Sequence, residues 1–325
     1  MVANGASWPR LGLMQAGPSK TVEVPSRRFG RYLVRSRLGE GGMAEVFLAE
    51  AVDAQGQQFP VALKLMKKDA PPEAFADEAD LMGLLDHPNL VRKLEAGQAF
   101  GRPFIAMEFL VGGDLRRLIE AHETLKRSFP LGMAVYVCTE VLRALAYFHQ
   151  VRTRTGRPLD LVHGDVNPSN IFFSGEGDVK LGDFGVAKAQ GADIGPQDGI
   201  TAGKLHYLSP EQTRGETLTA STDLFAMGIV LYELVVGTHP FIRGPLDDAA
   251  AMAAIRAAKL GLPDSVDKPL AQILRKALAP DKANRFRTAG EFAGALFTWA
   301  LDSGQHPTRQ HVQSWLLKTL SYAGL

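Results

Sequence analysis

A chain of 325 residues is long enough to bury more than one hydrophobic core, and its 46% apolar residues indicate a globular protein. The formal charge of +1 gives no sign of a surface for nucleic acid or another polyanion, so we expect no nucleic-acid partner. Cys138 is the only cysteine, which excludes an intrachain disulfide and favours a reducing compartment.

Apolar runs along the chain are short. The longest run, residues 225–236, contains Glu233, and the N-terminus lacks the apolar core of a signal peptide. We therefore predict a cytoplasmic protein with no membrane partner.

Residues 1–28 mix Gly, Pro, Ser and scattered charges without a sustained period, which predicts a flexible N-terminal segment. A strand is predicted to begin at Tyr32, and Gly39, Gly41 and Gly42 follow it. Glycine lets a backbone approach phosphate oxygens, but a glycine loop alone is more often a turn than a nucleotide site.

Two prolines at positions 71 and 72 suit the first turn of a helix, which we expect to end near Leu85. Phe75, Ala79 and Met82 share helical spacing with Leu85 and predict its buried face. Glu78 lies near that face; the alternative is a carboxylate on the surface.

An apolar strand is predicted over residues 103–110, and Asp114 follows it as either a helix N-cap or a ligand for a ribose or a basic peptide side chain. Helical spacing of apolar residues over 130–150 predicts a long buried helix. Residues 151–160 are polar and contain Gly and Pro, which predicts a loop on the surface; a partner contact is the alternative.

The stretch LVHGDVNPSNIFF, residues 161–173, presents Asp165 and Asn170 from one loop beside a short apolar strand. A carboxylate and a carboxamide on one rigid support can orient a hydroxyl and hold a metal ion, which is an arrangement for phosphoryl transfer. Asp183, within Gly-Asp-Phe-Gly, suits a Mg²⁺ ion that bridges nucleotide phosphates. Single Asp and Asn residues in loops usually form turns, but this ordered set argues against that here.

In this order and spacing, the motifs resemble those of the eukaryotic-like (Hanks-type) bacterial serine/threonine protein kinases, over residues 29–301. The resemblance implies an α+β, two-lobed protein kinase fold with ATP between the lobes. Residues 29–110 would form a small antiparallel β-sheet lobe with one main helix, and residues 111–301 a larger, mostly α-helical lobe. Residues 302–325 would be a C-terminal extension with a short amphipathic helix.

The resemblance also implies ATP and Mg²⁺ as cofactors. Lys64 would contact the α- and β-phosphates and pair with Glu78, and Ala44 stands where the third glycine of the loop is usual. Asn170 and Asp183 would hold the metal. The residues expected to bind the nucleotide are Gly39, Gly41, Gly42, Val46, Ala62, Lys64, Met107, Glu108, Leu110, Asp114 and Phe172.

Asp165 would accept the proton of the substrate hydroxyl, and two positions near it depart from the family pattern. Gly164 replaces the usual Arg, so activation should depend little on phosphorylation of the activation loop. Asn167 replaces a Lys that would face the γ-phosphate, and loss of such a cation raises the barrier. Lys204 stands where most such kinases carry Thr, and we hypothesise that it replaces the missing cation; an exposed loop lysine is the alternative.

Ser209-Pro210-Glu211 matches the kinase Ala-Pro-Glu signature, and Glu211 would form a buried ion pair with Arg285. Asp223 would brace the backbone of the catalytic loop. Further helical patterns cover residues 269–278 and 288–301.

A last amphipathic helix is predicted from Thr308, with Val312, Trp315, Leu316 and Leu320 on one side. This side would dock either on its own lobe or on a partner. We favour its own lobe, because an exposed Trp-Leu stripe is a liability.

The predicted function is transfer of the γ-phosphoryl group of ATP to Ser or Thr hydroxyls, and the expected partners are ATP and a protein substrate or regulatory partner. One alternative is a pseudokinase that binds nucleotide as a scaffold, which Gly164 and Asn167 favour. The other is a small-molecule phosphotransferase of the aminoglycoside or choline type, whose loop also often reads His-Gly-Asp.

Overall fold

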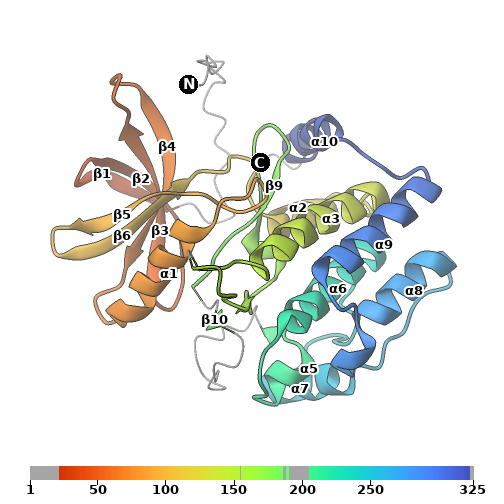
Figure 1. The fold of residues 1–325 in the computed structure, drawn as a ribbon. Helices are drawn as coiled ribbons and strands as arrows, with labels where there is room; N and C mark the ends of the chain where they lie inside the picture. The colour runs from red at the N-terminus through yellow and green to blue at the C-terminus, as the bar shows by residue number, and fades with distance from the viewer. Residues whose placement is uncertain (1–21, 154, 186–187, 190–204, 323–325) are drawn as a thin grey trace.

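The computed structural model describes residues 22–153, 155–185, 188–189 and 205–322, which form a small β-sheet lobe and a larger helical lobe (Figure 1). The sheet is antiparallel and six-stranded, in the order β1-β2-β3-β4-β6-β5, and one helix packs against it. The elements of this lobe are β1 (Val22–Phe29), β2 (Tyr32–Glu40), β3 (Ala44–Val52), β4 (Gln58–Met66), α1 (Pro72–Leu84), β5 (Lys93–Ala99) and β6 (Arg102–Glu108).

The two faces of the sheet have separate tasks. Residues directly opposite in antiparallel strands share a face, so Lys64 lies on the same face as its partners Val46 on β3 and Ile105 on β6. The alternate positions of β4, such as Leu63, are buried in a core that belongs to this lobe alone. The sheet therefore packs one face internally and presents Lys64 from the other.

Strand β1 corrects the prediction for the N-terminal segment. Residues 22–28 were expected to be flexible, but they pair antiparallel with β2, for example Arg28 with Leu33. The strand lies at the sheet edge, contains Pro25 and has an irregular register between Glu23 and Arg27. Proline and bulges are tolerated at edges, and they removed the alternating pattern that would have predicted a strand.

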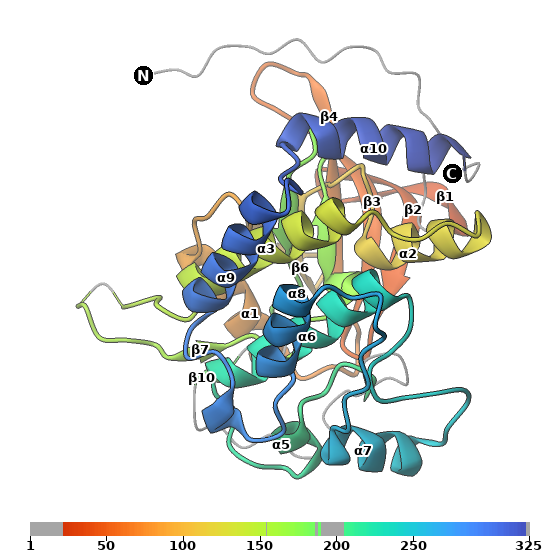
Figure 2. The ribbon, with the colours of Figure 1, turned by 90° about the vertical axis from the view of Figure 1, so that its right-hand side faces the viewer.

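The larger lobe is built on two buried helices, α3 and α6, which lie side by side in both ribbon views (Figure 2). Its elements are α2 (Leu115–Thr124), α3 (Leu131–Phe148), β7 (Leu161–Val162), η1 (Pro168–Asn170), β8 (Ile171–Phe173), β9 (Val179–Leu181), β10 (Lys188–Ala189), α5 (Pro210–Thr213), α6 (Ala220–Val236), α7 (Asp248–Ala257), α8 (Lys268–Ala277), η2 (Lys282–Asn284), α9 (Ala289–Asp302) and α10 (Arg309–Tyr322). The α+β, two-lobed fold is confirmed.

Helix α3 also corrects a prediction. No apolar stretch was expected to reach membrane-spanning length. By length and composition alone, however, α3 is long and apolar enough to cross a membrane. Within the described residues, 67% of it is buried inside the protein, where it packs against α6 and α9. Burial of this kind is what the central helix of a helical lobe requires.

Helix α10 packs on its own lobe, as predicted. Val312 and Leu316 are buried, and the Trp315 ring lies 5.1 Å from the ring of Phe129, edge to face. The surface loop is also confirmed, because most of the described residues between Arg152 and Asp160 are exposed.

Candidate active site

Lys64 links the two lobes. Its Nζ lies 2.6 Å from Glu78 Oε1 on α1 and 3.2 Å from Asp183 Oδ1 of the larger lobe. Glu78 is only 4% exposed, so it is not a surface charge. Burial lowers the pKa of Lys64, but the charges of Asp183 and Glu78 outweigh burial and the pKa is raised. Lys64 therefore remains a cation between two carboxylates.

Asp223 holds the backbone of the loop that precedes Asp165. Its Oδ2 accepts from His163 N at 2.9 Å and its Oδ1 from Gly164 N at 2.8 Å. His149 Nε2 lies 2.7 Å from Oδ2, so the carboxylate is enclosed by polar partners. The predicted bracing role of Asp223 is confirmed.

Both carboxylate oxygens of Asp165 are bonded within the loop. Asn167 Nδ2 donates to Oδ1 at 2.8 Å, and Asn170 Nδ2 donates to Oδ2 at 3.0 Å. Asn167 also accepts from Ser169 N at 2.9 Å, which makes it the cap of η1. From the sequence alone, Asn167 indicated only a missing cation. Its contact with Asp165 was not predicted, although an amide two residues after an Asp is a typical source of such a bond.

Asp183 lies close to Asn170, because a backbone hydrogen bond connects the two loops that carry them. Gly182 N donates to Asn170 O at 2.9 Å. The next residue, Phe184, is 1% exposed, and its ring is stacked 5.7 Å from Phe148. Burial of this ring fixes Asp183 toward Lys64.

The glycine loop is the turn between β2 and β3. Gly41 N donates to Ala44 O at 2.8 Å, and Gly39 pairs with Val46. A Cβ added at Gly39 or Gly42 would meet nothing within 4 Å, so packing of the described residues does not require glycine there. This open backbone is what approach by phosphate oxygens requires.

Two of the residues expected to bind the nucleotide lie where β4 meets β6. Ala62 pairs with Met107, on the face that also carries Lys64, and Phe172 forms an isolated bridge with Asp114 across the connection to the larger lobe. The Glu108 side chain is engaged, since it accepts from Lys180 at 2.8 Å. Ala62, Met107 and Lys64 therefore share one face of the sheet, while the Glu108 side chain is bonded to Lys180. The nucleotide-binding roles of these residues stay predictions.

Asp114 caps helix α2. Its Oδ1 accepts from Arg117 N at 2.9 Å, and burial raises its pKa. Of the two predicted roles, the N-cap is confirmed. Leu110 O accepts from Gly113 N at 3.2 Å in the turn before this cap.

Lys204 lies outside the described residues. Its predicted contact with a γ-phosphate therefore stays a prediction.

Gly164 has φ +74°, a conformation that costs about 1–2 kcal/mol for a residue with a Cβ. We expect Gly164→Ala to lower the free energy of unfolding by that amount, measured by urea denaturation. Gly294→Ala is the matched control, because Gly294 is exposed within α9 and should gain up to about 1 kcal/mol. Equal stabilities for the two variants would contradict the argument from φ.

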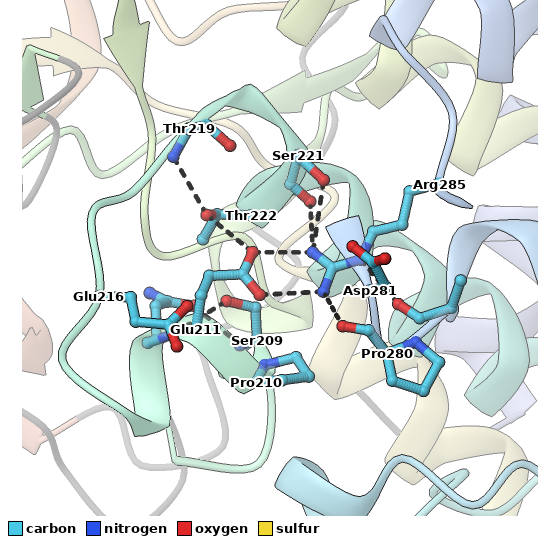
Figure 3. A network of polar contacts seen from close by, with 12 residues as sticks. Ser209, Pro210, Glu211, Glu216, Thr219, Ser221, Thr222, Pro280, Asp281 and Arg285 are labelled. Atoms are coloured by element: carbon cyan, nitrogen blue, oxygen red, sulfur yellow. Dashed lines mark hydrogen bonds and ion pairs between the residues drawn. The ribbon is translucent and has the colours of Figure 1, made fainter. Parts of the chain in front are cut away.

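Glu211 and Arg285 form the predicted buried ion pair (Figure 3). Arg285 Nη1 donates to Oε1 at 2.7 Å and Nη2 to Oε2 at 2.9 Å, while Thr222 Oγ1 donates to Oε1 at 3.1 Å. Next to this pair, Gln212 Nε2 donates to Gly164 O at 2.9 Å. The pair thus anchors a segment that touches the catalytic loop.

A family model described as the protein kinase domain matches residues 32–294. The chain belongs to the protein kinase family. Among its curated relatives, the tyrosine-protein kinase MasK of Myxococcus xanthus is 36% identical over 83% of this chain and 43% of its own length. The probable serine/threonine-protein kinase PknB of Bifidobacterium longum is 34% identical over 83% and 40%, and the serine/threonine-protein kinase PrkC of Bacillus subtilis is 31% identical over 85% and 41%.

The kinase chain spans about two fifths of the length of these relatives. What the relatives do as whole proteins is therefore only a guide to what this chain does.

The kinase residues fit Mg²⁺ with a nucleotide. Among the described residues no cluster of three His, Cys, Asp or Glu side chains could hold a metal alone. Mg²⁺ is usually held by one or two carboxylates together with substrate phosphates, and Asn170 and Asp183 supply hard oxygen donors of that kind. Both bonds described for the Asn170 side chain use Nδ2, which leaves Oδ1 as the donor for a metal.

Proposed function

We propose that this kinase transfers the γ-phosphoryl group of Mg-ATP to Ser or Thr hydroxyls of a protein. The observation that carries the proposal is the position of Lys64, whose Nζ contacts Glu78 of one lobe and Asp183 of the other. A scaffold that only binds nucleotide would also use Lys64, so the oriented Asp165 is the feature that favours transfer over binding alone.

Each residue has a role in this proposal. Lys64 would bind the α- and β-phosphates, and Asn170 and Asp183 would hold Mg²⁺, which neutralises phosphate charge when it is bound. Asp165 would take the hydroxyl proton, with its carboxylate oriented by Asn167 and Asn170.

The cation that usually faces the γ-phosphate is missing from the catalytic loop, since residues 161–173 contain no Lys or Arg. We propose that Lys204 supplies it from the activation segment. Gln212, eight residues further on, contacts Gly164 O, so this segment reaches the loop.

Lys204→Met should then lower turnover about 100-fold, because one phosphate-facing charge contributes a few kcal/mol to the transition state. Single-turnover transfer from Mg-ATP measures this step. Lys282→Met, which removes an exposed cation of η2, is the control and should keep the wild-type rate. If Lys204→Met also transfers phosphate at the wild-type rate, Lys204 does not supply the missing cation.

The test of the function is intact-protein mass spectrometry after incubation with Mg-ATP, with Mg²⁺ chelated in the control, followed by mapping of modified residues. Phosphoserine or phosphothreonine supports the proposal. Phosphotyrosine would move this chain toward the activity for which MasK is named. Nucleotide binding without any transfer would support the pseudokinase alternative.

For partners, we propose ATP and a protein substrate or regulatory partner, without nucleic acid or membrane. The near-zero formal charge supports the first exclusion. The single cysteine, which is buried in α3, supports a cytoplasmic location, and this stays a prediction.

A further inference from the structure

Helix α10 lies beyond the matched kinase domain and contacts the turn between β8 and β9 through side-chain hydrogen bonds. Arg309 forms an ion pair with Asp178, in which Nε lies 2.8 Å from Oδ1 and Nη2 donates to Oδ2 at 3.0 Å. Arg309 Nε also donates to Glu176 O at 3.1 Å, and Gln313 Nε2 donates to Gly175 O at 3.0 Å. The first two turns of α10 therefore bind both the Asp178 side chain and two carbonyl groups of the turn between β8 and β9.

The contact is close enough to dictate a residue type. Gly177 has φ +88°, and a Cβ there would lie 2.4 Å from Arg309 O and 2.8 Å from Gln313 N. Both clashes are with backbone, which cannot rotate away. Glycine at this position thus allows the turn and the helix backbone to touch.

The same turn supports the metal-binding residues. Strand β8 begins immediately after Asn170, and β9 ends immediately before Gly182 and Asp183. Each strand has three residues, so the turn lies only about 10 Å from these side chains. A short antiparallel hairpin of this kind transmits a displacement of its turn to its open end.

A second contact lies midway along α10. The ring of Trp315 is 6.2 Å from that of Phe173 on β8, edge to face. Phe173 N donates to Gly113 O, and Phe173 O accepts from Gly112 N, both at 2.9 Å. The helix therefore also supports the strand that is tied to the connection between the lobes.

We propose that α10 is a positioning arm for the Mg-nucleotide site, with Arg309 as its main positioning residue. The inference rests on the proposed function, since it assigns Asn170 and Asp183 to the metal. Arg309 is 54% exposed at its side chain, so its ion pair adds little to global stability. The ion pair instead fixes the position of the β8–β9 hairpin.

Two readouts test the arm in the whole chain. The first is hydrogen–deuterium exchange of backbone amides 171–181, without any ligand. The second is the gain in ADP affinity on adding Mg²⁺, measured by calorimetry. Arg309→Ala and Gly177→Ala act from opposite sides of the contact, and Lys318→Ala, exposed on the same helix, is the control.

We expect both test variants to speed exchange in these amides about tenfold and to reduce the gain from Mg²⁺ about tenfold, as loss of an outer support for metal ligands does. ADP affinity without Mg²⁺ should stay at the wild-type value, and so should every property of Lys318→Ala. Wild-type exchange and wild-type gain in both test variants would overturn the arm. A wild-type chain that binds no nucleotide would instead overturn the proposed function, while the exchange result would still decide whether α10 holds the hairpin.

Discussion

Replacing Asp165 by Asn should reduce phosphoryl transfer by about 1,000-fold or more while nucleotide affinity changes little. A positioned general base contributes about 100- to 10,000-fold, and an amide cannot take the hydroxyl proton. The exchange keeps the size of the side chain but leaves one acceptor oxygen for the two donors, Asn167 and Asn170. The loop should still keep its fold, because Asp223 holds its backbone at His163 and Gly164.

Single-turnover transfer and calorimetric ADP binding separate the two effects of Asp165→Asn. Asp264→Asn is the matched control, because it makes the same chemical change at an exposed position far along the chain. If the Asp165 variant transfers phosphate at the wild-type rate, Asp165 is not the base.

Arg285→Met should lower the free energy of unfolding by about 3–5 kcal/mol, because it leaves Glu211 buried without its partner. Urea denaturation measures this loss. Arg214→Met breaks the exposed pair with Glu216 and should cost under about 1 kcal/mol. A double change, Arg285→Met with Glu211→Leu, should recover most of the loss, since no charge then remains buried.

The same pair should make stability depend on pH. Burial raises the pKa of Glu211, but the hydrogen bonds and charge of Arg285 outweigh burial and the pKa is lowered. A lowered folded-state pKa stabilises the protein above the unfolded value, and this stability is lost as the pH falls through the folded value. In the double variant this contribution to acid sensitivity should be absent.

For the stability prediction, equal losses of unfolding free energy in Arg285→Met and Arg214→Met would contradict the argument that burial makes the Glu211–Arg285 pair important.

Short motifs were sufficient to predict which side chains of the site lie together. Lys64 contacts Asp183, and Asp165 accepts from Asn170. Their roles in catalysis and metal binding stay predictions. For Glu78, helical periodicity predicted only a position near a buried face, and the resemblance to kinases supplied its pairing with Lys64, which the structure shows. Glu211 and Arg285 lie 74 positions apart, and only the resemblance to kinases joined them before the structure did.

Other contacts could not be predicted, for identifiable reasons. The bond between Asn167 and Asp165 depends on the path of the loop and not on residue type alone. Helix α7 was not assigned, since its run of alanines gives a weak apolar pattern. The hydrogen bond from Arg309 to Asp178 connects residues 131 positions apart, so no local periodicity could predict it.

Strand β1 has a consequence for self-association. An open sheet edge offers a regular row of N–H and C=O groups on which a strand of another molecule can form a ladder. Here the row is interrupted, since Pro25 has no N–H and the pairing slips between Glu23 and Arg27. The irregular strand therefore covers β2 from Tyr32 to Arg37 and leaves a poor template for intermolecular β-pairing at this edge.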